Sequence, residues 1–467
     1  MERTQTHPFD FVDRTQVLEL LTEQLGTAWS SFDRPRTKEP QLSPELRERL
    51  REALPENPGD PQRSLAEAAE VLDASVSPSR PLYAAYIGST GLEAGVLASA
   101  LSNAYDVNLA SSAGAAELLE EQTLNWMGEF IGFPLQDGTF TSGGMTSNLT
   151  ALMAAREQAL PGTRVSGVAG QAAAVYCSAE SHHSVARAVE VIGLGSRAVR
   201  RVPIDEHRRM RIDALRDALN ADGAGGVTPV AVVATAGTTL TGAIDPLAEI
   251  AEICADRGIW MHVDAAYGGP AAAVPSVAPL FAGLERADSV TVDAHKWMGV
   301  QKSCSLVMLA QQGALQRAFS HNEAYMPHAG VAANGVDSTL EYSRPVRSLK
   351  LWMAFRIYGA ATLRGWIERT LDHARSLAQT IREHPRFELV GEQSLSIVCF
   401  RHLAGEDLDE HNLRLARAVA TDGRVYLAPA VVDGHSCLRV CFTNFRTGAE
   451  HIRELLEVVE EIADGIQ

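Results

Sequence analysis

Two reactive side chains of this sequence each follow an apolar run. Asp264 follows the stretch WMHV and precedes YGGP, and Lys296 lies in the later segment SVTVDAHKWMGV, beside His295 and Trp297. The carboxyl ends of parallel strands meet at the edge of the sheet where ligands bind. A carboxylate buried there needs a cationic partner. A lysine at such a place seldom lacks a function, and a surface lysine is the alternative interpretation.

A turn that contains glycine forms a second candidate element. The segment 141–148 reads TSGGMTSN and precedes the helical run LTALMAAREQAL. The free backbone N–H groups at the start of a helix can hold a phosphate group. The alternative is a tight strand-to-helix connection, in which the glycines only permit the turn.

Together, these elements meet the requirements of a pyridoxal phosphate site. The turn supplies a phosphate cradle, Lys296 can form an imine with the aldehyde, and ionised Asp264 would raise the pKa of the pyridine nitrogen. His182, in SAESHHSVARAVEVIG, follows a strand and starts a helix, where its ring can stack on the cofactor. The alternative for His182 is a plain polar residue at a helix start. The turn TAGTT at 235–239 offers hydroxyls near the cofactor, or a helix cap.

Short apolar segments that alternate with helices must position these residues. The candidate strands are 172–178, 230–235, 260–266, 289–293 and 305–309. Between the second and third lies PLAEIAEICADRG, where we expect Asp245 to cap a helix that Gly258 ends. Mostly apolar strands separated by helices are typical of a parallel sheet covered on both faces. The sequence therefore predicts the α/β class.

The chain divides into three parts. Residues 1–80 read as short helices broken by links that contain proline, and we expect this segment to pack on a partner subunit. Residues 81–345 form the predicted large α/β domain. Residues 346–467 begin with a helix near SLKLWMAFRIYG and continue with strands and helices, which is typical of a smaller α+β domain.

The composition argues against several classes of function. The 467 residues are 46% apolar and 21% charged, which is an ordinary globular composition. The formal net charge of −17 argues against nucleic acid or an anionic membrane as a partner. No apolar run reaches the length of a membrane span, and the N-terminus lacks the order of a signal peptide. The 6 cysteines form no CxxC pair and the 14 histidines no HExxH, so we expect no metal site and a cytoplasmic protein.

Six motifs carry a resemblance to a known family: FTSGGMTSNLTALMAAR, SHHSVARA, ATAGTT, HVDAAYGG, VDAHKW and RSLKLWMAFRIYG. From residue 80 onward the chain resembles the group II pyridoxal-phosphate-dependent decarboxylases, which act on aromatic L-amino acids, glutamate, cysteine sulfinate and histidine. The resemblance implies the fold-type I architecture, which is aspartate aminotransferase-like. It also implies pyridoxal 5′-phosphate as the cofactor, an amino acid as the substrate, and a homodimer with active sites at its interface.

The same resemblance assigns roles to individual residues. Lys296 becomes the Schiff-base lysine, Asp264 the partner of the pyridine nitrogen, and His182 the residue that stacks on the ring. Further cofactor contacts are implied for Gly143, Gly144, Thr239, Ala266 and His295.

Four more residues are expected on the substrate side. The resemblance places Tyr325 on a lid, within HNEAYMPHAGVAANGVDSTLEY, and implies that it protonates the substrate carbon after CO2 leaves. Tyrosine there favours plain decarboxylation, since phenylalanine accompanies aldehyde formation in relatives. Arg439 matches an arginine near the substrate carboxylate, and a sheet-edge arginine paired to an acid is the alternative. Tyr86 and Ser89 are candidates for side-chain recognition.

The expected reaction is decarboxylation to an amine and CO2, with alternatives. Aldehyde synthesis, transamination or carbon–carbon cleavage can occur on the same scaffold, and a non-catalytic binding or regulatory relative is a further alternative. A nicotinamide-dependent dehydrogenase ranks last, because no GxGxxG follows an early strand. The stretches STGL and GVQKSCS lean toward glutamate and cysteine-sulfinate enzymes, whereas HKW leans toward aromatic ones. The sequence therefore leaves the amino acid open.

Overall fold

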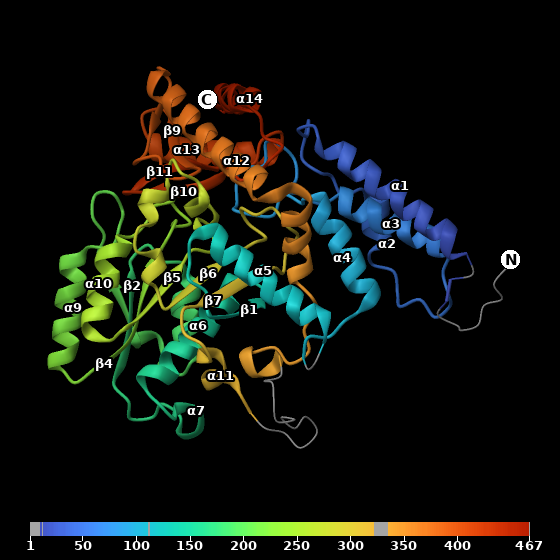
Figure 1. Cartoon of the computed structure of the whole chain (residues 1–467). Coiled ribbons are helices and arrows are strands. Elements are labelled where there is room, and N and C mark those ends of the chain that lie inside the picture. The colour runs from blue at the N-terminus through green and yellow to red at the C-terminus, as the bar shows by residue number, and fades with distance from the viewer. Residues whose placement is uncertain (1–9, 12, 111–112, 322–334, 467) are drawn as a thin grey trace.

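The computed structural model of the chain describes residues 10, 11, 13–110, 113–321 and 335–466. Figure 1 shows three regions: a large α/β domain, a smaller C-terminal domain beside it, and a group of N-terminal helices on another side. In the part of the chain described, no helix is both long and apolar enough to cross a membrane.

A seven-stranded sheet forms the centre of the large domain, in the order β1-β7-β6-β5-β4-β2-β3. The strands β2, β3, β4, β5 and β6 are parallel, and β7 runs antiparallel to both β1 and β6. The five predicted strands are confirmed, and β1 and β3 are additional. The strands are β1 (Asp137–Thr141), β2 (Ala173–Ser178), β3 (Val199–Val202), β4 (Thr228–Thr235), β5 (Trp260–Asp264), β6 (Ser289–Val292) and β7 (Ser305–Leu309).

Helices cover both faces of this sheet, which explains why its central strands are apolar throughout. In β4, Val232 packs into one core cluster, whereas its neighbour Val233 packs into another on the opposite face. The helices of the domain are α4 (Glu93–Tyr105), α5 (Ala115–Ile131), α6 (Gly144–Ala159), α7 (Thr163–Ser166), α8 (His183–Val191), α9 (Ile212–Ala224), α10 (Leu247–Arg257) and α11 (Ala314–Phe319). Short 3-10 turns are η1 (Ser196–Ala198), η2 (Gly269–Ala273), η3 (Ala278–Phe281), η4 (Leu284–Arg286) and η5 (Gly335–Ser338).

The expected cap of α10 is wrong. The N-cap position is occupied by Pro246, not Asp245, and no side chain caps this helix. The buried Asp245 carboxylate accepts instead from the backbone N–H groups of Met210, at 2.7 Å, and Thr235, at 2.8 Å. Asp245 therefore joins the end of β4 to the loop before α9.

The C-terminal domain is an antiparallel sheet in the order β10-β11-β9-β8, with helices on one face. Its other face contributes Ile397, Cys399, Cys437 and Cys441 to the core of the large domain. The long first helix is broken at Gly359, whose φ of 75° lies in the left-handed region. The elements are α12 (Ser348–Glu383), β8 (Phe387–Leu389), β9 (Ile397–His402), α13 (Leu408–Asp422), β10 (Ala428–Val432), β11 (His435–Cys441) and α14 (Ala449–Gly465).

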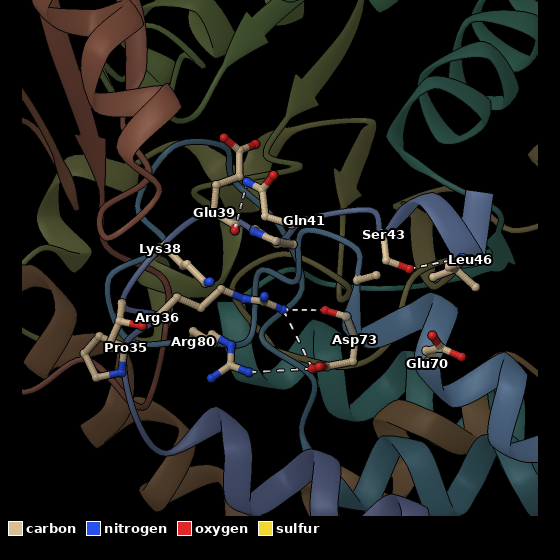
Figure 2. Close-up of a pocket in the computed structure, with 13 residues that line it drawn as sticks. Pro35, Arg36, Lys38, Glu39, Gln41, Ser43, Leu46, Glu70, Asp73 and Arg80 are labelled. Carbon is tan, nitrogen blue, oxygen red and sulfur yellow. Dashed lines mark hydrogen bonds and ion pairs between the residues drawn. The ribbon is translucent and has the colours of Figure 1, made fainter. Parts of the chain in front are cut away.

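The N-terminal helices pack loosely on the rest of the chain. They are α1 (Arg14–Phe32), α2 (Pro44–Arg49) and α3 (Pro61–Asp73), and neither α1 nor α3 contains a buried residue. Charged groups hold the connecting segments in place: Arg36 and Arg80 both approach the Asp73 carboxylate, at 3.8 Å and 4.0 Å (Figure 2). Exposed ion pairs of this kind stabilise a fold only weakly.

Candidate active site

A cleft at the carboxyl edge of the parallel strands collects six of the residues that the sequence singled out. They are Gly144, His182, Thr239, Asp264, Ala266 and Lys296. They come from α6, the start of α8, the loops after β4 and β5, and the turn after β6. The structure therefore brings these six residues together, because each of these segments follows a strand end.

Asp264 is a buried carboxylate without a protein cation. It is the last residue of β5, and its Oδ2 accepts a hydrogen bond of 2.8 Å from Nδ2 of Asn148. Its Oδ1 accepts from the backbone N–H of Ala266 at 3.2 Å. Among the described residues, no lysine or arginine lies within ion-pair distance of Asp264. Because a buried carboxylate needs a cationic partner, this site suits a ligand that carries a protonated ring nitrogen.

Lys296 points its amine at a second buried carboxylate. Its Nζ lies 2.9 Å from Oδ2 of Asp293, and Nε2 of His295 lies 3.8 Å from the same oxygen. Burial by itself would raise the pKa of Asp293, but Lys296 and His295 outweigh it and hold that pKa below its ordinary value. Burial also lowers the pKa of His295, whose Nδ1 lies 3.0 Å from the carbonyl oxygen of Cys304. The lysine amine is thus held in the cleft by an ionised acid.

The start of α6 provides a cradle that only glycine permits. A Cβ on Gly144 would lie 2.9 Å from Oδ2 of Asp293 and 3.3 Å from Cβ of Ala266. Gly143 precedes the helix in an extended conformation, and a Cβ there would meet nothing closer than His295, at 3.9 Å. No side chain caps this helix, so its first N–H groups are available to an anion. This is the environment that a phosphate group requires.

His182 lies both at a helix start and in the cleft, and its stacking on a cofactor ring stays a prediction. It is the N-cap of α8, where Nδ1 accepts from the backbone N–H of Ser184 at 3.2 Å, and it also lines the cleft. Burial lowers the pKa of His182, although the nearby Asp264 carboxylate opposes this. The imidazole is therefore neutral near pH 7.

Several predicted substrate residues lie outside this cleft. Arg439 in β11 is buried, and its two terminal nitrogens donate to the backbone carbonyls of Thr239 and Ala85. Tyr86 is exposed, and Ser89 is buried with its Oγ accepting from Gly91 N–H at 3.2 Å. Tyr325 lies outside the described residues. The substrate roles of these four residues stay predictions.

The cleft is also lined by Asn148, Ser184 and Asp293, which were not predicted from the sequence. Asp293 follows the strand β6 directly, so the rule that found Asp264 could have found it too. Asn148 and Ser184 lie inside helices, where a polar residue usually faces solvent, and nothing local marks them as buried.

Comparison with known proteins agrees with this geometry. The model of the pyridoxal-dependent decarboxylase conserved domain matches residues 44–403. The chain is 31% identical to the aromatic-L-amino-acid decarboxylase of Bacillus atrophaeus over 434 residues, which cover 90% of this chain and 89% of that protein. It is 29% identical to phenylacetaldehyde synthase of Arabidopsis thaliana, with 89% of each chain covered.

Solved structures give the same result. The crystal structure of Oryza sativa TDC with PLP and tryptamine superposes with a TM-score of 0.91 at 26% identity, covering 99% of this chain and 100% of that chain. Mouse CSAD in apo form gives a TM-score of 0.88 at 25% identity, covering 97% and 99%.

The residues of the cleft fit pyridoxal 5′-phosphate. Within the described part of the chain, no lysine or arginine pairs with Asp264 and no side chain caps α6, and Lys296 lines the same cleft. The chain belongs to the pyridoxal-dependent decarboxylase family, and it is a pyridoxal-phosphate-dependent carboxy-lyase that converts an amino acid to an amine and CO2.

Proposed function

We propose that this protein decarboxylates an aromatic L-amino acid and releases the corresponding amine. The relatives support this choice. They include the Bacillus atrophaeus aromatic-L-amino-acid decarboxylase, tyrosine decarboxylase of Papaver somniferum at 29% identity, and tryptophan decarboxylase 2 of rice at 30% identity. Each match covers between 86% and 90% of this chain.

The charge of the cleft is the observation that carries the choice of substrate. Among the described residues that line it, Lys296 is the one lysine or arginine. Its amine already pairs with the buried Asp293 carboxylate at 2.9 Å, so it offers little to an acidic substrate side chain. Arg439, the cation that the sequence predicted near the substrate, already donates to two backbone carbonyls. A substrate with a second carboxylate would be desolvated there without a partner, whereas an aromatic ring would not.

The residues of the cleft have distinct roles in this proposal. Lys296 holds the cofactor through Nζ and recovers it when the amine leaves. The chemistry that pyridoxal phosphate would supply here is an electron sink for the pair left on Cα by the loss of CO2. Asp264 keeps the ring nitrogen protonated, and the N–H groups at the start of α6 hold the phosphate, with Gly143 and Gly144 permitting the close approach.

Other side chains orient the ring and exclude water. His182 would stack on the ring and contact the substrate carboxylate, while Thr239, Ala266 and His295 would surround the cofactor. Desolvation of the substrate carboxylate favours CO2 loss, because the transition state disperses the charge that the ground state concentrates.

Proton return to Cα decides the product. We assign this step to Tyr325, whose phenol would donate its proton to the carbon after CO2 leaves. The product is then an amine. Oxidative formation of an aldehyde is the second candidate function, because phenylacetaldehyde synthase of Arabidopsis thaliana is among the relatives.

We also propose that the protein is a cytoplasmic homodimer with active sites at the subunit interface. The outer surface of α4 exposes Leu97, Leu101 and Tyr105, which are 45%, 49% and 79% exposed and four residues apart. Apolar side chains in such a row on one helix face suit burial against a second subunit. The loosely packed α1 and α3 suit the same role. The six cysteines are free and buried, which fits a reducing compartment.

A substrate screen tests the proposal. The purified protein, loaded with pyridoxal phosphate, is incubated with the twenty amino acids, dihydroxyphenylalanine, cysteine sulfinate and 2,4-diaminobutyrate, and amine, aldehyde and CO2 are measured by mass spectrometry. We expect one or more aromatic amines in equal amount to CO2, and no turnover by Lys296→Ala. Turnover of glutamate or cysteine sulfinate alone would overturn the choice of substrate. Aldehyde with ammonia would overturn the choice of reaction.

A further inference from the structure

A buried chain of hydrogen bonds runs along one face of β5, away from the Asp264 carboxylate. Asn148 Nδ2 donates to Asp264 Oδ2, and Asn148 Oδ1 lies 3.0 Å from Nε2 of His262. Nδ1 of His262 lies 2.8 Å from Oγ of Ser289. The same Ser289 oxygen accepts from the indole N–H of Trp260 at 2.8 Å. Trp260, His262 and Asp264 alternate along β5, so they share this face.

None of these five side chains is open to solvent. The exposed fraction is 6% for Asp264, 2% for Trp260, 1% for Asn148, and 0% for His262 and Ser289. Hydrogen bonds in such surroundings are stronger than at the surface, and an unpaired donor or acceptor is costly. The geometry of each group therefore constrains the next.

The two ends of the chain fix the direction of every bond. An ionised carboxylate only accepts, so Asn148 must turn its NH2 group to Asp264 and its oxygen to His262. Nε2 of His262 then carries a hydrogen. Burial lowers the pKa of His262 to about 4, so its ring is neutral and Nδ1 must accept from the Ser289 hydroxyl. Trp260, which can only donate, completes the chain at Ser289.

A branch leads from Asn148 to the stacking histidine. Nδ2 of Asn148 also donates to Oγ of Ser184 at 3.0 Å. That oxygen lies 2.9 Å from Nδ1 of His182, which also accepts from the Ser184 backbone N–H. Because Nδ1 accepts, the hydrogen of the neutral His182 ring is on Nε2. The two hydrogens of one amide group thus serve two residues of the cleft.

We propose that Asn148, oriented by His262, Ser289 and Trp260, is a positioning residue that holds the Asp264 carboxylate in place toward the cofactor and fixes the tautomer of His182. The inference rests on the proposed roles of Asp264 and His182 at the cofactor. The Asn148 donor stabilises the charged form of the carboxylate. If His262 lost its Nε2 hydrogen to Nδ1, the Asn148 amide could turn over and present its oxygen to Asp264. The carboxylate would then compete with the ring nitrogen for a proton.

Variants along the chain test this in the cofactor-loaded enzyme. His262→Phe, Asn148→Ala and Ser289→Ala break it at three places, and His262→Gln keeps a donor near the Nε2 position. The control is His402→Phe, which removes another fully buried histidine in the small domain. Nδ1 of His402 lies within hydrogen-bond distance of Nε2 of His411, at 3.0 Å. The readouts are the visible absorbance of the bound cofactor against pH, kcat and KM separately, and the melting temperature.

We expect the three breaking variants to shift the midpoint of the absorbance titration by about one pH unit. We expect kcat to fall by about 10- to 100-fold, the range seen for outer-shell partners of metal ligands, with KM changed less. In His262→Gln, the titration midpoint and kcat should both be close to those of the unmodified enzyme. His402→Phe should lower the melting temperature and leave the titration unchanged.

Two outcomes separate this inference from the proposed function. If the breaking variants lower only the melting temperature, as the control does, the chain is purely structural and the inference is wrong. If His262→Phe and Asn148→Ala do not fold, Ser289→Ala still tests the inference, because it removes only a single hydroxyl. Full turnover by Lys296→Ala would instead overturn the proposed function.

Discussion

Nζ of Lys296 lies 2.9 Å from Oδ2 of Asp293, three residues earlier in the chain, and that carboxylate also borders Gly144 at the start of α6. The reactive amine and the phosphate cradle therefore share one buried acid. Because β6 ends immediately before Asp293, the sheet fixes this acid and, through it, the lysine.

Gly144→Ala should weaken cofactor binding by about 5- to 150-fold, since clashes in a packed site typically cost about 1–3 kcal/mol. Its Cβ would lie 2.9 Å from Asp293 and 3.3 Å from Ala266. Gly143→Ala is the matched comparison, because its Cβ would meet nothing closer than 3.9 Å. The dissociation constant of pyridoxal phosphate, measured by absorbance, should rise more for Gly144→Ala. Equal effects of the two changes would argue against the cradle.

Asp264→Asn should lower kcat by about 10- to 100-fold, the effect of losing about 1.5–3 kcal/mol from a charged hydrogen bond. The substitution keeps the shape of the side chain but removes its charge. Steady-state kinetics on the loaded enzyme measure the effect. A kcat close to that of the unmodified protein would show that the ring nitrogen does not depend on this acid.

His262 should make the folded protein sensitive to acid. Its pKa is about 4 in the folded chain and 6.5 in the unfolded chain, so only the unfolded chain binds this proton between those values. Stability is therefore lost as the pH falls from about 6.5 toward 4, by about 2 kcal/mol at pH ~5.

His262→Gln should remove this contribution. Urea unfolding at neutral pH and at pH ~5 should show a decrease in unfolding free energy that is smaller by about 2 kcal/mol in the variant. If the unfolding free energy fell equally with pH in the two proteins, His262 would not be held neutral in the folded chain.

Arg439→Met should lower the unfolding free energy by about 1–3 kcal/mol, because two buried backbone carbonyls lose a charged donor. The comparison is Arg453→Met on α14, where the arginine is exposed and its nearest acid, Glu457, is 3.7 Å away. We expect that change to have little effect. A large rise in KM for Arg439→Met with unchanged stability would instead support the predicted contact with the substrate carboxylate.

The strands that carry the chemistry could be predicted because burial on both faces makes them apolar throughout. Asp264 and Lys296 stood out as polar residues at the ends of such runs. The strand β1 reads DGTFT and lacks this signal. The antiparallel direction of β7 could not be predicted either, since side-chain alternation is the same in both directions.

The other contacts that could not be predicted join residues that are distant in the sequence. Asp245 looked like a helix cap because aspartate suits that position, yet its partners are the backbone of Met210 and Thr235. Asn148 meets His262 across 114 positions. Only the packing of α6 on the sheet brings them together, and no local pattern encodes that contact.

The most direct test of the account is to locate the covalent attachment of the cofactor. The chain has only four lysines, Lys38, Lys296, Lys302 and Lys350, so peptide mapping after borohydride reduction gives a simple answer. Lys350 is a useful internal comparison, because it is more buried than Lys296 but donates to the carbonyls of Gln301, Lys302 and Ser303. We predict that the reduced cofactor is found on the peptide of Lys296 alone. Attachment to any other lysine, or none in a protein that still forms amine, would contradict the central claim.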